Sequence, residues 1–300
     1  MAKEPKTIQE QIELLSQRGM LFHDINQAPH YLANISYYRL KGYWWEMQQD
    51  FEKHTFKPDT YFENIIDNYN FDRNFRILVF NAIERIEVSL RTKLIYHMSL
   101  DYGAHWFVNQ SLFTDPFNHS IFLSKLNREM LSSSEEFMKK HYGNHKNEVP
   151  ESWKALEIVT LGTLSKLYKN INTQLPAKSR ITNELGINSA KDLASWLSAI
   201  TLIRNIIAHH SRLWNRAIIT KYKWPKSTRF PLLDYTPDDQ RRKKIFPILC
   251  AMIYLNDRIS PGHHLKKELQ ELFHDFPSIP KYKLGFPPDW QEQPLFKNFY

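Results

Sequence analysis

The sequence has few glycines and a single cysteine. Eight glycines beside 16 prolines in 300 residues do not suit a turn-rich β architecture, and they favour long helices joined by proline-containing loops. Because Cys250 stands alone, an intrachain disulfide and a zinc site built on thiolates are both excluded. No other pattern of metal ligands is evident, so we expect neither a metal nor a cofactor.

Long apolar runs are missing as well. No segment approaches the roughly 20 consecutive apolar residues of a membrane-spanning helix. The first residues, MAKEPKTIQEQIELL, lack the apolar stretch of a signal peptide. We therefore expect a cytoplasmic protein that does not bind a membrane.

Acidic residues are outnumbered by basic ones. The chain carries 40 Lys and Arg against 32 Asp and Glu, a net charge of +8, and its isoelectric point is near 9.3. This excess favours an anionic partner, of which nucleic acid is the commonest, although the charge could also serve solubility alone. Hydrophobic residues make up 42% of the chain, which is enough for a large core.

Helical periodicity dominates the sequence. Thr7 and Glu10 have the spacing of a capping box, which predicts a helix over 8–18. Residues 61–100 carry the strongest pattern, with apolar side chains at three- and four-residue steps, and predict a helix of about 30 residues. Its apolar positions are Phe71, Phe75, Leu78, Val79, Ala82, Ile83, Ile86, Leu90 and Leu94. Further helices are expected over 23–35, 119–141, 151–171, 189–214 and 238–259, with NTQLPAKSR (172–180) as a connector.

These elements predict an all-α protein. Residues 1–60 would hold N-terminal helices and an aromatic, basic segment, and residues 61–260 would form a helical bundle. Residues 261–300, rich in proline and aromatic side chains, would form an irregular, extended tail on the surface.

The stretch RNIIAHHSRLWN, residues 204–215, brings polar chemistry into a hydrophobic helix. On an ideal helix continued through this stretch, Asn205, His209 and Arg212 share an outer face. His210 borders the apolar stripe, which favours a core or boundary position over an accessory role in chemistry. Arg212 fits either a solvated face or an accessory role.

Arg204 is the exception, because it falls within the apolar stripe. Burying an unpaired guanidinium costs several kcal/mol, so this side chain needs a partner. That partner could be an acid on the long helix, such as Glu84 or Glu87. It could equally be another subunit or a ligand phosphate.

The segment RNIIAH resembles the R-x4-6-H motif of the HEPN superfamily. Its flanks, RNIIAHHSRLWNR, resemble the signature of the bacterial abortive-infection (Abi) family of the D/F type. Three other segments resemble that family's remaining blocks, in its order: SYYRLKGYWW at 36–45, ERIEVSLRTKLIYHMSLDYGAHWF at 84–107 and LEIVTLGTLSKLYKN at 156–170. The resemblance covers about residues 10–220.

This resemblance implies a HEPN-type helical bundle. It also implies a metal-independent endoribonuclease that acts in phage defence or in a toxin–antitoxin pair. A structured small RNA would be a further partner. It assigns catalysis to Arg204 and His209, with Asn205 as the polar residue that often follows the arginine. Histidine suits removal of the RNA 2′-OH proton, and arginine suits the charge of the phosphorane. Because Arg204 and His209 lie about 140° apart on one helix, we expect a homodimer with a composite site.

Two stretches combine basic and aromatic side chains, a mixture that favours contact with unpaired nucleic acid. In the alternative, the aromatic rings are buried and the basic side chains merely solvated. The candidate RNA-binding residues are Lys221, Lys223, Trp224, Lys226 and Arg229 in one stretch and Tyr38, Arg39 and Lys41 in the other. Two further hypotheses stay open: a non-catalytic RNA-binding protein, and an interaction scaffold whose charge serves solubility.

Overall fold

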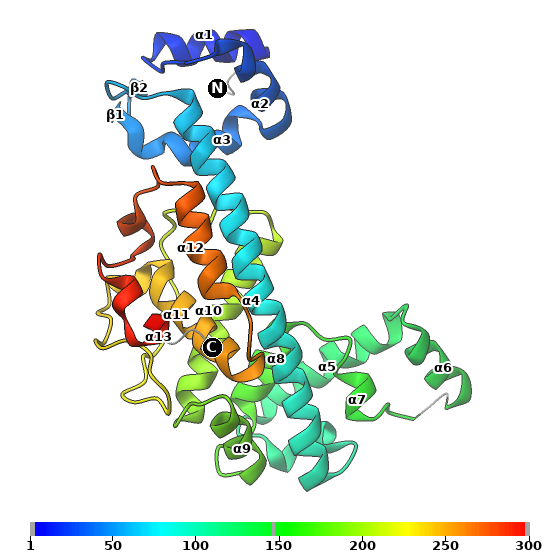
Figure 1. Cartoon of the computed structure of the whole chain (residues 1–300). Coiled ribbons are helices and arrows are strands. Elements are labelled where there is room, and N and C mark those ends of the chain that lie inside the picture. The colour runs from blue at the N-terminus through cyan, green and yellow to red at the C-terminus, as the bar shows by residue number, and fades with distance from the viewer. Residues whose placement is uncertain (1–3, 146–147, 298–300) are drawn as a thin grey trace. The chain divides into compact units, whose positions relative to one another are not determined.

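The computed structural model describes residues 4–145 and 148–297 (Figure 1). Within those residues it contains thirteen α-helices and one antiparallel pair of short strands, β1 (Gln48–Asp50) and β2 (Thr55–Phe56). The all-α prediction is therefore confirmed. The helices are α1 (Ile8–Gln17), α2 (Ala28–Ile35), α3 (Tyr37–Trp44), α4 (Phe62–Tyr102), α5 (Pro116–Ser132), α6 (Glu136–Asn144), α7 (Ser152–Ala155), α8 (Leu161–Asn170), α9 (Pro176–Glu184), α10 (Ala190–Ala208), α11 (Ile245–Ile259), α12 (Leu265–Asp275) and α13 (Pro294–Lys297).

The described chain divides into two compact units. The first comprises the chain up to Ile77 together with two later segments, Arg212–Trp214 and Leu269–Pro280. The second comprises the remaining described residues. These units cut across the ranges 1–60, 61–260 and 261–300 that the sequence suggested, because two short, distant segments join the N-terminal helices.

In the first unit, local signals set the start of the chain. The Thr7 N–H donates to Glu10 Oε2 at 2.6 Å and the Glu10 N–H donates to Thr7 Oγ1 at 3.2 Å, which confirms the capping box.

Phe71, near the start of α4, packs its ring against Trp214 and Phe273, at centroid distances of 5.9 and 5.6 Å. The two later segments of this unit are thus fixed by aromatic packing on one α4 side chain.

Helix α4 spans 41 residues and fills the whole periodic range. It would be about 60 Å long at 1.5 Å per residue, more than three times the length of an average domain helix. All nine apolar positions predicted for its stripe are buried. The predicted range was therefore correct and the predicted length too short.

Three other predictions failed at helix boundaries. The expected helix over 119–141 is broken at Ser133, between α5 and α6, and the one over 151–171 is broken between α7 and α8. The predicted connector at 172–180 contains the start of α9, because Pro176 occupies the first turn, where its missing N–H costs no hydrogen bond.

After Asp275 the C-terminal segment has only short helical turns up to α13, but it is not an extended surface tail. The stretch LKKELQELFHD forms α12 and buries its apolar face. Farther on, Phe286, Trp290 and Phe296 are each at most 4% exposed and their rings contact one another. Proline interrupts regular structure here without removing the aromatic side chains from the core.

Lys178 is a buried cation in the second unit. It is 1% exposed, and its ammonium donates to the carbonyls of Ile171 and Lys169 at the C-terminal end of α8. These carbonyls lack partners inside their own helix, so the lysine satisfies them. Burial lowers the pKa of Lys178 from 10.5 to about 8.

This lysine predicts a pH dependence of stability. The folded protein releases the proton near pH 8 and the unfolded chain holds it until about pH 10.5, so unfolding takes up a proton between these values. We expect the Lys178 contribution to raise the free energy of unfolding across this window, by at most about 3 kcal/mol. Burial raises the pKa of Cys250 and acts in the opposite direction. Denaturation of wild type and Lys178→Met at each pH cancels that term, and parallel curves would contradict the prediction.

Candidate functional site

Helix α10 carries the motif at its C-terminal end. Ser189 caps its start, where the side-chain oxygen accepts the Asp192 N–H at 3.3 Å. The helix packs against α8, α9 and α11 of the same unit. Its buried side comprises Leu193, Ala194, Trp196, Leu197, Ala199, Ile200, Ile203, Ile206 and Ile207.

The helix ends at Ala208, six residues before the predicted end. The His210 N–H donates to Ile207 O at 2.8 Å and the Ser211 N–H to Ile206 O at 3.0 Å. These two bonds form a Schellman motif, in which the first residue after the C-cap has a left-handed backbone. His210 is that residue, with φ of 52°. Glycine is usual there, so the sequence carried no stop signal.

The early end corrects two predicted positions. Arg212 lies outside the helix, so it does not extend the face of Asn205. His210 sits in the cap and is exposed, so it does not border the apolar stripe. Arg204, Asn205 and His209 keep the angular separations around the α10 axis that an ideal helix predicts.

Arg204 is half-buried and has no acidic partner. Among residues 4–145 and 148–297, its guanidinium forms neither a hydrogen bond nor an ion pair. Glu87 pairs instead with Arg91 on its own helix, at 3.2 Å. An ion pair with Glu84 or Glu87 therefore does not account for this arginine, and its charge stays available to an anion.

Asn205 and His209 are exposed on one side of α10. Neither side chain is hydrogen-bonded to another described residue. An amide, an imidazole and a guanidinium thus gather within two turns at the end of one helix, and no described residue engages any of the three. The guanidinium and the amide can bind phosphate oxygens, and the imidazole can take up or release a proton during cleavage of a phosphate ester.

In the first unit, Asp72 organises a buried polar cluster that the sequence analysis missed. It is fully buried, and its carboxylate accepts from Tyr43 Oη at 2.7 Å and Arg76 Nε at 3.1 Å. The other oxygen accepts the backbone N–H of Leu213, at 3.0 Å, and of Trp214. Burial raises the pKa of Asp72, and the four donors oppose that shift.

The same unit brings two of the motif blocks together. A Cβ added to Gly42 would lie 3.7 Å from Cδ and Nε of Arg212. Gly42 therefore lies close to the Arg212 side chain, and the Asp72 carboxylate links Tyr43 to the backbone of Leu213 and Trp214. These contacts give Arg212 a structural environment in the first unit.

The N-terminal RNA-binding candidates are only partly exposed. Tyr38 is 86% exposed and Arg39 is exposed, whereas Lys41 is half-buried, 5.6 Å above the ring of Trp45. All three lie on α3 in the first unit. The neighbouring Tyr43 and Trp44 are buried, so the aromatic part of this stretch mainly packs the core.

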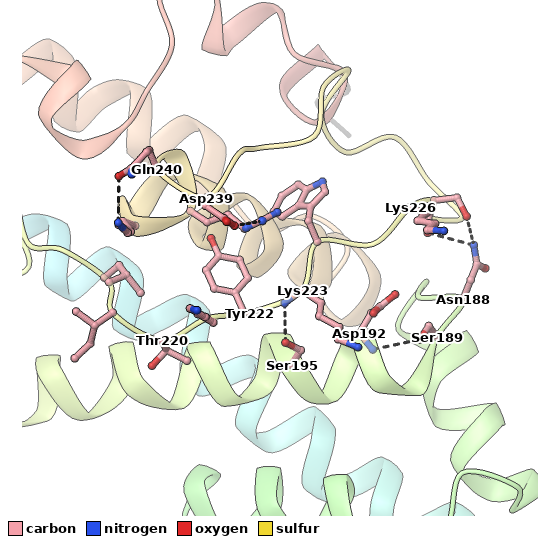
Figure 2. A pocket seen from close by; sticks show the side chains of 17 residues that line it. Asn188, Ser189, Asp192, Ser195, Thr220, Tyr222, Lys223, Lys226, Asp239 and Gln240 are labelled. Carbon is pink, nitrogen blue, oxygen red and sulfur yellow. Dashed lines mark hydrogen bonds and ion pairs between the residues drawn. The ribbon is translucent and has the colours of Figure 1, made fainter.

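A pocket of about 1100 Å³ opens in the second unit beside α10. The first turns of the helix, from Ser189 to Ser195, form one side, and residues 218–227 and 239–243 form the other. Figure 2 shows Thr220 on the far side of Ser195 from Ser189, so the pocket extends along α10 toward the motif.

Four of the five C-terminal candidates line this pocket: Lys221, Lys223, Trp224 and Lys226. Arg229 does not, although its Nε donates to Oδ1 of the lining residue Asn188 at 3.4 Å. Arg242 and Lys243 line the pocket too. Both belong to the helix predicted over 238–259, but they precede α11, which begins at Ile245, and no local pattern connected them with 221–229.

No group of three or more His, Cys, Asp or Glu side chains in residues 4–145 and 148–297 is arranged to hold a metal ion. No helix in those ranges is long and apolar enough to cross a membrane.

Comparison with known proteins identifies a family. The sequence model of the family described as Abi-like protein matches residues 30–215, more than half of the chain. The matched region contains α10, the Arg204–His209 motif and the Asp72 cluster. No curated protein and no solved structure matches the chain.

Proposed function

Because the chain belongs to the Abi-like protein family, which suggests abortive infection and phage defence, we propose that it is a HEPN-type metal-independent endoribonuclease. The observation that carries the proposal is the end of α10. There, a half-buried arginine without an acidic partner lies five residues before an exposed histidine. A structural arginine would have a carboxylate, whereas one that binds phosphate must keep its charge unneutralised.

The chemistry requires few groups. His209, as general base, takes the proton from a ribose 2′-OH, and the 2′-oxygen attacks the adjacent phosphorus. The bond from phosphorus to the 5′-oxygen breaks, and that oxygen gains a proton from the protonated histidine or from water. Arg204 stabilises the charge that builds on the phosphoryl oxygens, and Asn205 orients the phosphate. The products are a 2′,3′-cyclic phosphate and a free 5′-OH.

The active form is a homodimer. Arg204 and His209 lie about 140° apart around α10, so a single helix does not aim both side chains at one phosphate. A second copy, related by two-fold symmetry, supplies the missing group, so that each site takes its arginine from one chain and its histidine from the other. A structured small RNA acts as a further partner that controls the enzyme.

A non-catalytic RNA-binding protein is the second candidate. The basic pocket favours it, because binding there needs neither Arg204 nor His209. Cleavage itself therefore decides between the two functions.

Cleavage without metal is the direct test. We expect the purified protein to cut single-stranded RNA in excess EDTA at an unchanged rate, since histidine and arginine supply all the chemistry. Mass spectrometry of the fragments should find 2′,3′-cyclic phosphate and 5′-OH ends. Binding without cleavage, or cleavage that EDTA abolishes, would rule out this mechanism. A matched reaction on 2′-O-methyl RNA, which lacks the nucleophile, should give no fragments.

A further inference from the structure

The pocket beside α10 is strongly basic. Five cationic side chains line it against two acidic ones, a net charge of +3. Asp239 is already paired with Arg242, and this contact holds the pKa of Asp239 below its ordinary value. Lys221, Lys223 and Lys226 form no ion pair with any described residue. The pocket therefore concentrates positive charge that the protein itself leaves uncompensated.

The wall that carries these lysines is held in place by hydrogen bonds. The Lys223 N–H donates to Ser195 Oγ at 2.8 Å, and Trp196 Nε1 donates to Lys223 O at 3.1 Å. At the two ends, the Ile218 N–H donates to Lys243 O at 2.7 Å and Asn188 Nδ2 donates to Ser227 Oγ at 3.2 Å. A wall fixed along its length loses little conformational freedom when a ligand binds.

Aromatic side chains alternate with the lysines. Trp224 is half-buried and its ring lies 5.8 Å from that of Trp196. Tyr222 is 5% exposed, and its hydroxyl has no hydrogen-bond partner among the described residues. A buried hydroxyl without a partner is unfavourable for folding, so this group points to a ligand that can bond to it. In Figure 2 the Tyr222 ring extends toward Asp239, across the pocket.

The lysine-bearing wall of the pocket meets α10 on the same side as His209. Ser195, where the lysine wall is attached, lies within about 40° of His209 around the axis of α10. The two residues are about 20 Å apart along that axis. A strand that left the pocket beyond Thr220 and followed α10 would therefore reach His209 without crossing the helix.

We infer that this pocket binds a single-stranded RNA segment several nucleotides away from the scissile phosphate and guides the strand along α10 to His209. The lysines bind backbone phosphates, Trp224 stacks on an unpaired base, and the Tyr222 hydroxyl bonds to a ribose or base oxygen. The inference rests on the proposed function for the identity of the ligand. It adds a binding site distinct from the cleaving groups.

Binding and cleavage can be measured separately. The probe is a short, fluorescent 2′-O-methyl RNA strand without self-complementarity, which cannot be cleaved. We expect Lys221→Glu/Lys223→Glu to weaken binding by more than tenfold. We also expect the slope of log affinity against log salt to fall by about 1.4, since each phosphate contact on a single strand contributes about 0.7.

A matched variant controls for overall charge. Lys139→Glu/Lys140→Glu makes the same change on exposed positions of α6, outside the pocket, and should leave both affinity and slope nearly unchanged. Equal losses in the two variants would overturn the inference, as would a preference for duplex RNA of the same length. On cleavable RNA, the pocket variant should raise KM and leave kcat within a few fold.

Tyr222→Phe tests the hydroxyl without disturbing the wall. We expect it to raise the thermal unfolding midpoint by about 2 °C, because a buried group without a partner is removed. The same change should weaken RNA binding several-fold, and unchanged binding would overturn the role of the hydroxyl. If wild type binds RNA through the pocket but does not cut it, the proposed function fails, and the assignment of the pocket as a single-stranded RNA site stands without its role in guiding cleavage. If it cuts RNA and the pocket variant matches wild type, the inference fails alone.

Discussion

Replacing His209 with alanine is expected to slow RNA cleavage by about a hundredfold to ten-thousandfold, the contribution of a general base. The side chain is exposed and forms no hydrogen bond with a described residue, so the fold should be unaffected. Single-turnover cleavage rates of wild type and variant give the effect. Circular dichroism and binding of 2′-O-methyl RNA should be unchanged.

His210→Ala is the matched control. His210 also follows Arg204 within the spacing of the motif, but its backbone is left-handed, which turns its side chain away from the helical position. We expect its cleavage rate to stay within a few fold of wild type. If His210→Ala is inactive and His209→Ala active, the catalytic assignment moves to the second histidine.

Mixing two inactive variants extends the same test to the dimer. In a composite site, a heterodimer of Arg204→Ala and His209→Ala chains has one intact site and one doubly defective site. Random exchange of subunits should therefore restore about one quarter of the wild-type activity. Complete inactivity of the mixture, with exchange shown by mass, would place both groups of each site in one chain.

Replacing Asp72 with alanine should cause the largest loss of stability. The substitution leaves Arg76 buried without its partner and removes the acceptor for the N–H groups of Leu213 and Trp214. Breaking a buried ion pair from one side costs about 3–5 kcal/mol. Guanidinium denaturation, followed by tryptophan fluorescence, measures the change.

Two variants bracket this effect. Tyr43→Phe removes one of the four donors to Asp72 and should cost about 1 kcal/mol. Asp67→Ala, at an exposed position of the same helix, should change stability by less than about 0.5 kcal/mol. If Asp72→Ala were no less stable than Asp67→Ala, the Asp72 cluster would not be what holds the segment 212–214 in the first unit.

Local patterns predicted the helices well and their ends less well. The stripe along α4 follows from spacing alone, because a helix repeats its buried face every three to four residues. The end of α10 does not, since the capping position holds a histidine where glycine would have marked the stop. A helical wheel drawn through 215 therefore misplaced Arg212.

The candidate functional residues show the same limit: those close together in the chain could be predicted, and those joined by long-range contacts were harder to find. Arg204 and His209 are five residues apart, and their relation could be read from the chain. Asp72 offered one signal that the sequence analysis overlooked: an acidic residue next to Phe71 and near Phe75, inside an apolar stripe. The basic and aromatic pattern at 221–229 identified part of the pocket wall, but not the pocket itself, because 239–243 and the start of α10 join it through contacts that no local pattern encodes.

The left-handed cap at the end of α10 has an evolutionary consequence. A side chain with a Cβ costs about 1 kcal/mol in that conformation, and glycine adopts it freely. Selection for heat resistance alone would therefore enrich glycine at position 210. The histidine that stands there beside His209 gives up that gain in backbone freedom.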